Sequence, residues 1–411
     1  MTAMDKIMPY LIKIGDNKYL VSIRDGLSFT VPFTIIGSLF LIIGNLPIEA
    51  WMTIISPYSG LLGSMVTVTF GMLGLISAIG VGYSMAKQFK LEPLSNTLIT
   101  VVAFLLATTN KDFTIDIANL GATGMFTALI VAGLTTIITR FVIKRDLVIK
   151  MPEGVPPAVA QSFFSLTPAA FTLTIVWIVR VALNIEINTI LQMVFKPLVF
   201  SLNTIPGLLV YTFLALGLWT LGIHGPNLLS GIATPIFLSN IAMNMEAFQK
   251  GATIPNEVAD GFWTLFMNIG GSGATIGLVI AMIFGRSKAF RELGKLSFPS
   301  AIFCINEPII FGFPIVMNPI MAIPFVLTPM VLGVSTIILM RLGLIGRIVF
   351  QVPWTTPPII GPYLATNGNV GAAIWSCLTI VISYVIYLPF FRMVDKKQSL
   401  METTNLEEEV N

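Results

Sequence analysis

The chain has 411 residues, of which 55% are hydrophobic and only 10% are charged, and its mean hydropathy is +0.88. Soluble globular domains carry about 25% charged residues, so this composition excludes a water-soluble globule and indicates a polytopic membrane protein. The net charge of +3 comes from short basic loops and does not indicate nucleic-acid binding. One histidine and two cysteines in apolar runs exclude a disulfide framework, a CxxC site and a histidine-cluster metal site. We therefore expect no metal and no other cofactor.

The N-terminal part of the chain has the pattern of regular membrane spans. Residues 1–26 are expected to form an amphipathic cytoplasmic segment, because apolar residues recur at helical spacing among basic ones. Spans are then predicted over about 27–45, 62–86, 94–109, 122–143 and 169–185. Clusters of Lys and Arg at 6–24, 87–90 and 140–150 alternate with loops poor in both, which places the N-terminus in the cytoplasm.

In the C-terminal part of the chain, the apolar segments are interrupted more often. Residues 186–204 are expected to form an interfacial or connecting helix. Glycine and proline interrupt 228–248 and 296–317, so we predict a re-entrant hairpin at each. The run Gly270-Gly271-Ser272-Gly273 lacks the Lys-Ser/Thr of a phosphate-binding loop and is interpreted as a packing element within a span. Further spans are predicted over about 205–222, 262–285, 318–340 and 370–391.

These segments predict an all-α polytopic membrane protein with both termini in the cytoplasm. Nine spans are clear, and an even number is required, so we expect about ten transmembrane helices, two re-entrant hairpins and amphipathic interfacial helices. The change from regular to interrupted apolar segments divides the rest of the chain into three parts. We expect a transmembrane part at 27–185, a part with broken spans at 186–392, and an acidic, disordered cytoplasmic tail at 393–411.

Glu307 is the strongest candidate for a functional residue. It is the only charged residue between Lys295 and Arg341, and proline follows it at positions 308 and 314. A carboxylate at membrane depth is costly, so we expect it to face protein or a wet cavity. Transporter binding sites lie where helices are interrupted, which places the site in the C-terminal part. A structural acid paired with an arginine is the alternative interpretation.

Other side chains near the breaks suit a sugar. His224 is the single histidine, and it stands in a Gly/Pro-rich turn, where a capping or core role is equally open. An aromatic face packs on the C–H face of a sugar ring, and hydroxyls need directional donors and acceptors. Trp219, Trp354 and Asn306 join Glu307 in supplying these groups, although tryptophans taken singly are typical of the membrane interface.

Three segments resemble those of a known family: PEGVPPAV at 152–159, GIHG at 222–225 and INEPIIFG at 305–312. They are similar to segments of the lactose/cellobiose/diacetylchitobiose permeases, the enzyme IIC components of the bacterial phosphoenolpyruvate-dependent phosphotransferase system. The resemblance extends from Arg24-Asp25-Gly26 to the last span, and the Asn-Glu-Pro motif in an apolar run is its most specific element.

The resemblance implies a membrane component of a sugar phosphotransferase complex. It implies a homodimer in the bacterial cytoplasmic membrane, with dimerisation through 27–185 and sugar binding in 186–392. The implied substrate is a β-linked disaccharide, cellobiose or diacetylchitobiose rather than lactose. Its C6 hydroxyl would take phosphate from a phosphocysteine on a separate IIB protein, which a IIA protein supplies.

The resemblance also implies roles for individual residues. Glu307 and His224 would lie near the reacting hydroxyl, with Glu307 as the general base. Sugar contacts would come from Asn306, Trp219 and Trp354, with Arg24 contributing at the cytoplasmic side. Two alternatives remain: an ion-coupled secondary sugar transporter that uses Glu307 as its proton site without phosphorylation, and a membrane scaffold or sensor without transport.

Overall fold

The computed structural model describes residues 17–45, 49–313 and 315–410. These residues form helices and turns, without a strand among them, which confirms the predicted all-α class. Seven of the described helices are long and apolar enough to cross a membrane, and a bent helix pair raises the number to eight. The difference from the expected ten arises because some apolar segments are short or broken. The apolar positions of 1–16 that predicted an amphipathic helix lie outside the described residues.

The chain divides into two compact units, each discontinuous in sequence. Unit 1 comprises Met1–Leu41, Pro57–Phe200 and Leu228–Ala242, and unit 2 comprises Ile42–Ser56, Ser201–Asn227 and Met243–Asn411. The helices of the first half are α2 (Lys18–Ser28), α3 (Val31–Gly44), α4 (Glu49–Ile55), η1 (Ser56–Tyr58), α5 (Ser59–Thr69), η2 (Phe70–Met72), α6 (Leu73–Gln88), α7 (Pro93–Ala107), η3 (Ile117–Leu120), η4 (Ala122–Gly124), α8 (Met125–Lys144), α9 (Pro157–Trp177) and η5 (Ile178–Ala182). Those of the second half are α10 (Ile187–Leu202), α11 (Ile205–Thr220), α12 (Gly225–Gln249), η6 (Trp263–Met267), α13 (Ile276–Ile283), α14 (Lys288–Ile302), α15 (Glu307–Gly312), α16 (Pro319–Arg341), α17 (Ile360–Ala365) and α18 (Val370–Val410).

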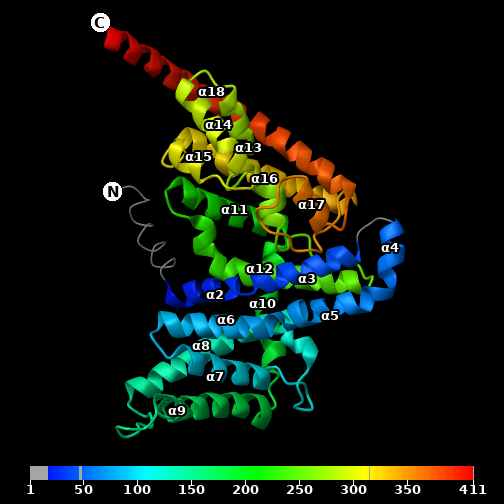
Figure 1. Ribbon diagram of the computed structural model, residues 1–411, viewed down its shortest axis with the longest axis vertical. Coiled ribbons are helices and arrows are strands. Elements are labelled where there is room, and N and C mark those ends of the chain that lie inside the picture. Colours follow the sequence, from blue (N-terminus) through cyan, green and yellow to red (C-terminus); the bar gives the residue numbers. More distant parts are fainter. Residues whose placement is uncertain (1–16, 46–48, 314, 411) are drawn as a thin grey trace. The chain divides into compact units, whose positions relative to one another are not determined.

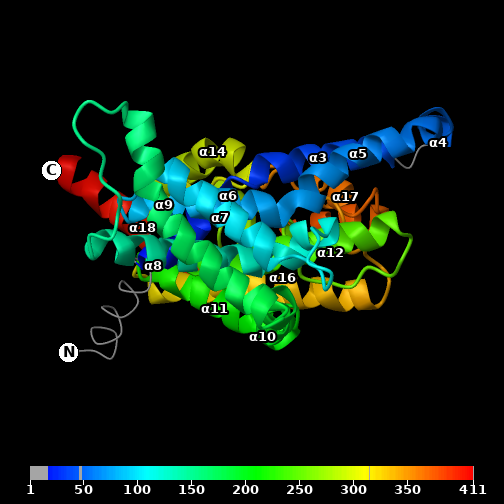
Figure 2. The ribbon, with the colours of Figure 1, turned by 90° about the horizontal axis from the view of Figure 1, so that it is seen from below.

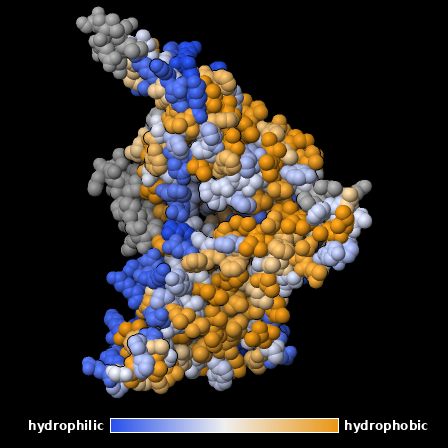
Figure 3. All heavy atoms as spheres, in the orientation of Figure 1, coloured by the Kyte–Doolittle hydropathy of each residue, from blue (hydrophilic) through white to orange (hydrophobic). Residues whose placement is uncertain are grey.

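Unit 1 is organised around α6, which packs against α2, α7 and α8. Figures 1 and 2 both show α6, α7 and α8 side by side. Small buried residues, including Ala78, Ala103 and Ala128, let these helices approach, and the ring of Phe104 fills the space between them. On the face shown in Figure 3, apolar side chains cover most of the helical surface, as expected where lipid is the solvent.

The re-entrant hairpin predicted over 228–248 is wrong. These residues lie within α12, a continuous helix of 25 residues that is itself a candidate span. Pro235 removes one backbone hydrogen bond without ending the helix. Gly231 serves close packing instead of a break, because a Cβ there would lie 2.7 Å from the carbonyl oxygen of Leu20.

The chain breaks instead within the predicted span 262–285. A π-helix, η6, is followed by a turn in which Gly270, Gly271, Gly273 and Ala274 all have positive φ, and only then by the short helix α13. The Gly-rich run is therefore the break itself, which corrects its interpretation as a packing element within a span. The second predicted break, over 296–317, is a helix–turn–helix formed by α14 and α15.

The tail at 393–411, expected to be disordered, is helical as far as the structure describes it, because α18 continues to Val410. Two acidic side chains of this extension bind the start of α14. Asp395 accepts hydrogen bonds from the backbone N–H groups of Arg286 and Ser287, at 2.8 and 2.9 Å. Glu402 accepts one from the hydroxyl of Ser287 at 2.5 Å. Carboxylates at a helix N-terminus are favourable, so these contacts hold the acidic helix in place.

Candidate functional site

Helix α11 ends in a Schellman motif that fixes the direction of the chain. The N–H of Gly222 donates to the carbonyl of Trp219 at 2.9 Å, and the N–H of Ile223 donates to the carbonyl of Leu218 at 3.0 Å. Gly222 has φ of +82°, a conformation that L side chains rarely adopt. The chain therefore reverses sharply, and α12 begins only three residues later.

His224 is the N-cap of α12. Its Nδ1 accepts a hydrogen bond from the backbone N–H of Asn227 at 3.1 Å, so the capping role left open by the sequence is confirmed. A neutral imidazole that accepts at Nδ1 carries its hydrogen on Nε2, and a doubly protonated ring could not make this cap. The ring also packs against the Trp219 indole, with centroids 4.4 Å apart and planes at 47°. The cap thus fixes both the tautomer and the position of the imidazole.

Close packing of α12 on α11 supports this arrangement. A Cβ on Gly225 would lie 2.0 Å from the carbonyl oxygen of Ala215. Only glycine lets the first turn of α12 approach α11 this closely. The Gly-Pro that follows His224 in the sequence therefore has a structural purpose: it brings the histidine beside the last turn of α11.

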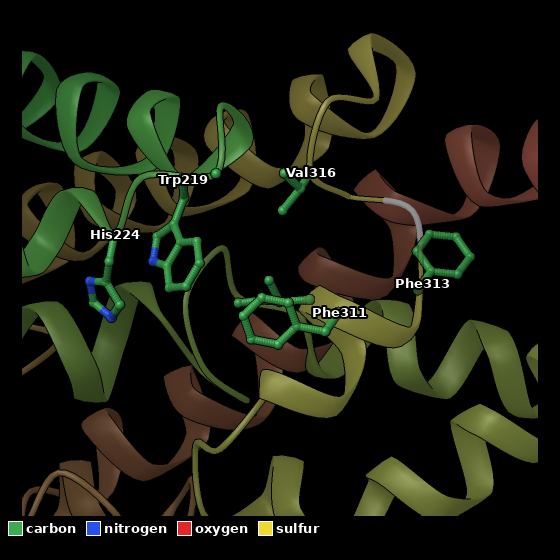
Figure 4. A pocket seen from close by; sticks show the side chains of 7 residues that line it. Trp219, His224, Phe311, Phe313 and Val316 are labelled. Carbon is green, nitrogen blue, oxygen red and sulfur yellow. The ribbon is translucent and has the colours of Figure 1, made fainter. Parts of the chain in front are cut away.

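A pocket of about 480 Å³ opens beside these two rings. Its lining consists of Trp219, Gly222, His224, Ile310, Phe311, Phe313 and Val316, all within unit 2. Figure 4 shows Trp219 and His224 next to each other, with Phe311 below the indole and Val316 above it. The indole Nε1 of Trp219 is buried and has no hydrogen-bond partner among the described residues. The pocket therefore combines an aromatic wall with the imidazole of His224.

Asn306 joins the two broken segments of unit 2. Its side chain is 4% exposed, and its Nδ2 donates to the carbonyl of Ser272 and to the hydroxyl of Thr275, both at 2.8 Å. Gly271 permits this contact, because a Cβ there would lie 2.3 Å from the Asn306 Cγ. The Asn-Glu-Pro break and the Gly-rich break therefore form one hydrogen-bonded element.

Glu307 is the first residue of α15 and is exposed. It forms no ion pair with an arginine of the described chain, so the alternative of a paired structural acid is not what the structure shows. Residues spaced three and four apart share one face of a helix. Glu307 therefore shares a face of α15 with Ile310 and Phe311, which line the pocket, although Glu307 itself is not in the lining.

The structure does not bring all the predicted site residues together. Trp354 lies in the segment before α17, is 55% exposed and is not part of the pocket lining. Arg24 belongs to α2 in unit 1, where its Nη2 lies 2.7 Å from Oδ1 of Asp25. The roles of both residues in binding sugar stay predictions. Sequence reasoning missed the apolar wall supplied by α15 and the segment after it, although the apolar run that follows the Asn-Glu-Pro motif was its signal.

Comparison with known proteins identifies the family. The family model described as "Phosphotransferase system, EIIC" matches residues 24–329. The lichenan permease IIC component of Bacillus subtilis (strain 168) is 40% identical, covering 98% of this chain and 95% of that protein. The cellobiose-specific EIIC component of Geobacillus stearothermophilus is 39% identical, covering 97% of this chain and 94% of that protein. The crystal structure of ChbC, the IIC component from the N,N'-diacetylchitobiose-specific phosphotransferase system, matches with a TM-score of 0.93 at 36% identity, covering 97% of this chain and 99% of that one. The chain is a multi-pass membrane sugar permease and belongs to the EIIC family of the phosphotransferase system.

Proposed function

We propose that this permease imports a β-linked disaccharide, cellobiose or diacetylchitobiose rather than lactose. It presents the C6 hydroxyl of the sugar to a phosphocysteine on a separate IIB protein, which a IIA protein phosphorylates. The similarity to relatives named for cellobiose and diacetylchitobiose, at 39% and 36% identity, supports this substrate class. Both termini lie in the cytoplasm, because basic residues cluster at alternate ends of the spans.

The observation that carries the proposal is the pocket beside Trp219 and His224. Its volume of about 480 Å³ lies within the range of small-molecule sites. The indole face of Trp219 packs on the C–H face of one sugar ring. The Nε2–H of His224, fixed by the cap at Nδ1, donates to a sugar oxygen.

Glu307 supplies the general base at the start of α15. The C6 oxygen attacks phosphorus, the bond between phosphorus and the cysteine sulfur breaks, and the thiolate leaves. The hydroxyl proton passes to the Glu307 carboxylate as the new P–O bond forms. Only an ionised carboxylate can accept this proton.

The test is sugar phosphorylation by the protein in vesicles, supplied with phosphoenolpyruvate and purified carrier proteins including IIA and IIB. Glu307→Gln keeps the size of the side chain and loses the base, so turnover should fall about 10²–10⁴-fold while binding of cellobiose is retained. His224→Gln should weaken both binding and turnover. Glu292→Gln, which removes an exposed acid paired with Lys295, is the matched control and should leave both unchanged. Phosphorylation at the wild-type rate in Glu307→Gln would rule out the base.

The same vesicles separate the alternatives. An ion-coupled secondary transporter would take up sugar without phosphoenolpyruvate, and an uncoupler would abolish that uptake. A scaffold or sensor without transport would show no accumulation under either condition. The proposed homodimer is checked by light scattering of the purified protein, where a monomeric mass would contradict it.

A further inference from the structure

A second pocket, in unit 1, shares no lining residue with the pocket beside Trp219 and His224. It has a volume of about 460 Å³ and lies where the start of α2, the turn after α6 and the last turns of α8 meet. We call it the basic pocket. Its lining is Tyr19, Phe89, Lys90, Leu91, Ile137, Arg140, Phe141, Ile143 and Lys144.

Aromatic rings hold the central cation of the basic pocket in place. The guanidinium of Arg140 lies 4.4 Å from the centroid of the Phe89 ring, and its Nη1 lies 3.5 Å from the Tyr19 hydroxyl. The rings of Tyr19 and Phe89 pack with centroids 4.7 Å apart. Stacking orders the guanidinium without using all its donors, so the remaining N–H groups are available to an anion.

Within the described part of the chain, no acidic side chain pairs with the cations of the basic pocket. Lys90, Arg140 and Lys144 make no ion pair among the residues that the structure describes. The two described acids nearest in sequence to Lys90 and Lys144 have other partners. Glu92 caps α7 by accepting from the N–H groups of Leu94 and Ser95, and Asp146 pairs with Lys150 at 2.5 Å. The basic pocket therefore offers three cationic groups to an external anion.

One wall of the basic pocket continues as an apolar strip along α8. Ile137 and Phe141 line the pocket and are each 52% exposed, and Ile130, two turns before Ile137, is 45% exposed. A soluble anion would gain nothing from such a strip. An amphipathic anion, whose charged head enters the pocket while its chain follows α8, would satisfy both the cations and the apolar side chains.

We propose that the basic pocket binds the phosphate headgroup of an anionic phospholipid, with an acyl chain along Ile137 and Phe141. Arg140 receives the phosphate oxygens through paired N–H donors, and Lys90 and Lys144 supply point charges. The position fits this ligand, because basic ends of spans face the leaflet rich in anionic lipids.

The test is titration of the purified protein, in neutral detergent, with dioctanoyl phosphatidylglycerol, with bound lipid counted by native mass spectrometry. We expect saturable binding that weakens with ionic strength. Lys90→Gln/Lys144→Gln leaves the aromatic stack intact and should bind about thirtyfold more weakly, as expected for the loss of two interfacial cations. Lys396→Gln/Lys397→Gln, which removes two exposed cations from α18, is the matched control and should bind like the wild type.

Two further titrations identify the chemical class of the ligand. Dioctanoyl phosphatidylcholine should bind weakly, and inorganic phosphate at equal ionic strength should not displace the anionic lipid. Equal binding of the neutral lipid, displacement by phosphate alone, or unchanged affinity in Lys90→Gln/Lys144→Gln would each overturn the proposal. A second protomer that is retained by the wild type and lost in that variant would identify the surface as an interface between copies and would also overturn it.

Discussion

Replacement of Asn306 should loosen the junction between the two broken segments. Its amide donates to Ser272 and Thr275 from a position that is 4% exposed. Asn306→Asp keeps the shape of the side chain but removes both donors. Asn306→Ala removes both the donors and the volume of the side chain. Comparing the two variants therefore separates the effect of hydrogen bonding from that of packing.

The magnitude follows from the two hydrogen bonds. Each is worth about 1 kcal/mol net, and a buried acceptor left without a partner costs about 1–3 kcal/mol. The hydroxyl of Thr275 keeps its own bond to the carbonyl of Gly270, at 2.8 Å, whereas the carbonyl of Ser272 loses the Asn306 donor. Both variants should therefore favour opening of this junction by about 2–4 kcal/mol.

Cys304 provides a local probe, because it lies two residues before Asn306 and is only partly exposed. In a Cys377→Ser background, the rate at which a thiol reagent labels Cys304 reports opening of the junction. A loss of 2–4 kcal/mol corresponds to labelling about 30–900 times faster. Labelling of Asn306→Asp at the wild-type rate would show that the two hydrogen bonds do not hold the junction closed.

A change in the partner segment should produce the same effect. Gly271→Ala places a Cβ 2.3 Å from the Asn306 Cγ, at φ of +101°. Gly343→Ala is the matched control, since Gly343 also has positive φ (+73°) but no atom within 4 Å of a built Cβ. Comparable labelling of Cys304 in the two variants would mean that backbone strain, and not the contact with Asn306, decides the result.

Two further predictions concern charged groups near the segment 250–260. Burial raises the pKa of Asp260 to about 6, against the opposing hydrogen bond from Gln351. Between pH 4 and 6 the folded state therefore keeps a proton that the unfolded state loses. The free energy of unfolding should fall by about 3 kcal/mol as pH rises from 4 to above 6. Thermal unfolding of Asp260→Asn should not show this dependence of stability on pH. Glu257 accepts from Arg341 at 2.9 Å and from Arg347 at 3.3 Å, and its side chain is 10% exposed. Glu257→Gln should lower the unfolding free energy by about 1–3 kcal/mol. This is less than for a fully buried pair, because Arg341 is half exposed. A melting temperature equal to that of the wild type would contradict this prediction.

The positions of the breaks were only partly predictable from the sequence. Hydropathy and helix breakers suggested one at 228–248, where Pro235 costs a single hydrogen bond and α12 stays continuous. The true break, at Gly270 to Ala274, lies in an apolar run that hydropathy treats as a span. Four consecutive or near-consecutive positive φ angles are a property of the backbone, and three glycines were their only sign in the sequence.

The aromatic part of the site was more accessible to sequence reasoning. The Gly-Ile-His-Gly motif at the end of an apolar span placed His224 five residues after Trp219, and the structure packs their rings at 4.4 Å. A capping role for His224 could be considered from the sequence, because the glycine and proline that follow it are typical of a helix start. The wall supplied by α15 could not be foreseen, since it depends on which helix faces of unit 2 meet.

The hydrogen bonds of Asn306 sharpen the roles within the Asn-Glu-Pro motif. Both N–H groups of its amide are used inside the protein, so the amide cannot donate to a sugar without breaking the junction with Ser272 and Thr275. A general base must be held within hydrogen-bond reach of its substrate, and Glu307 is attached directly to this anchored residue. If Asn306 acts by positioning Glu307, then Asn306→Asp should lower kcat for phosphorylation more than it raises KM. A rise in KM at constant kcat would instead show that Asn306 contributes binding that is equal in the ground state and the transition state.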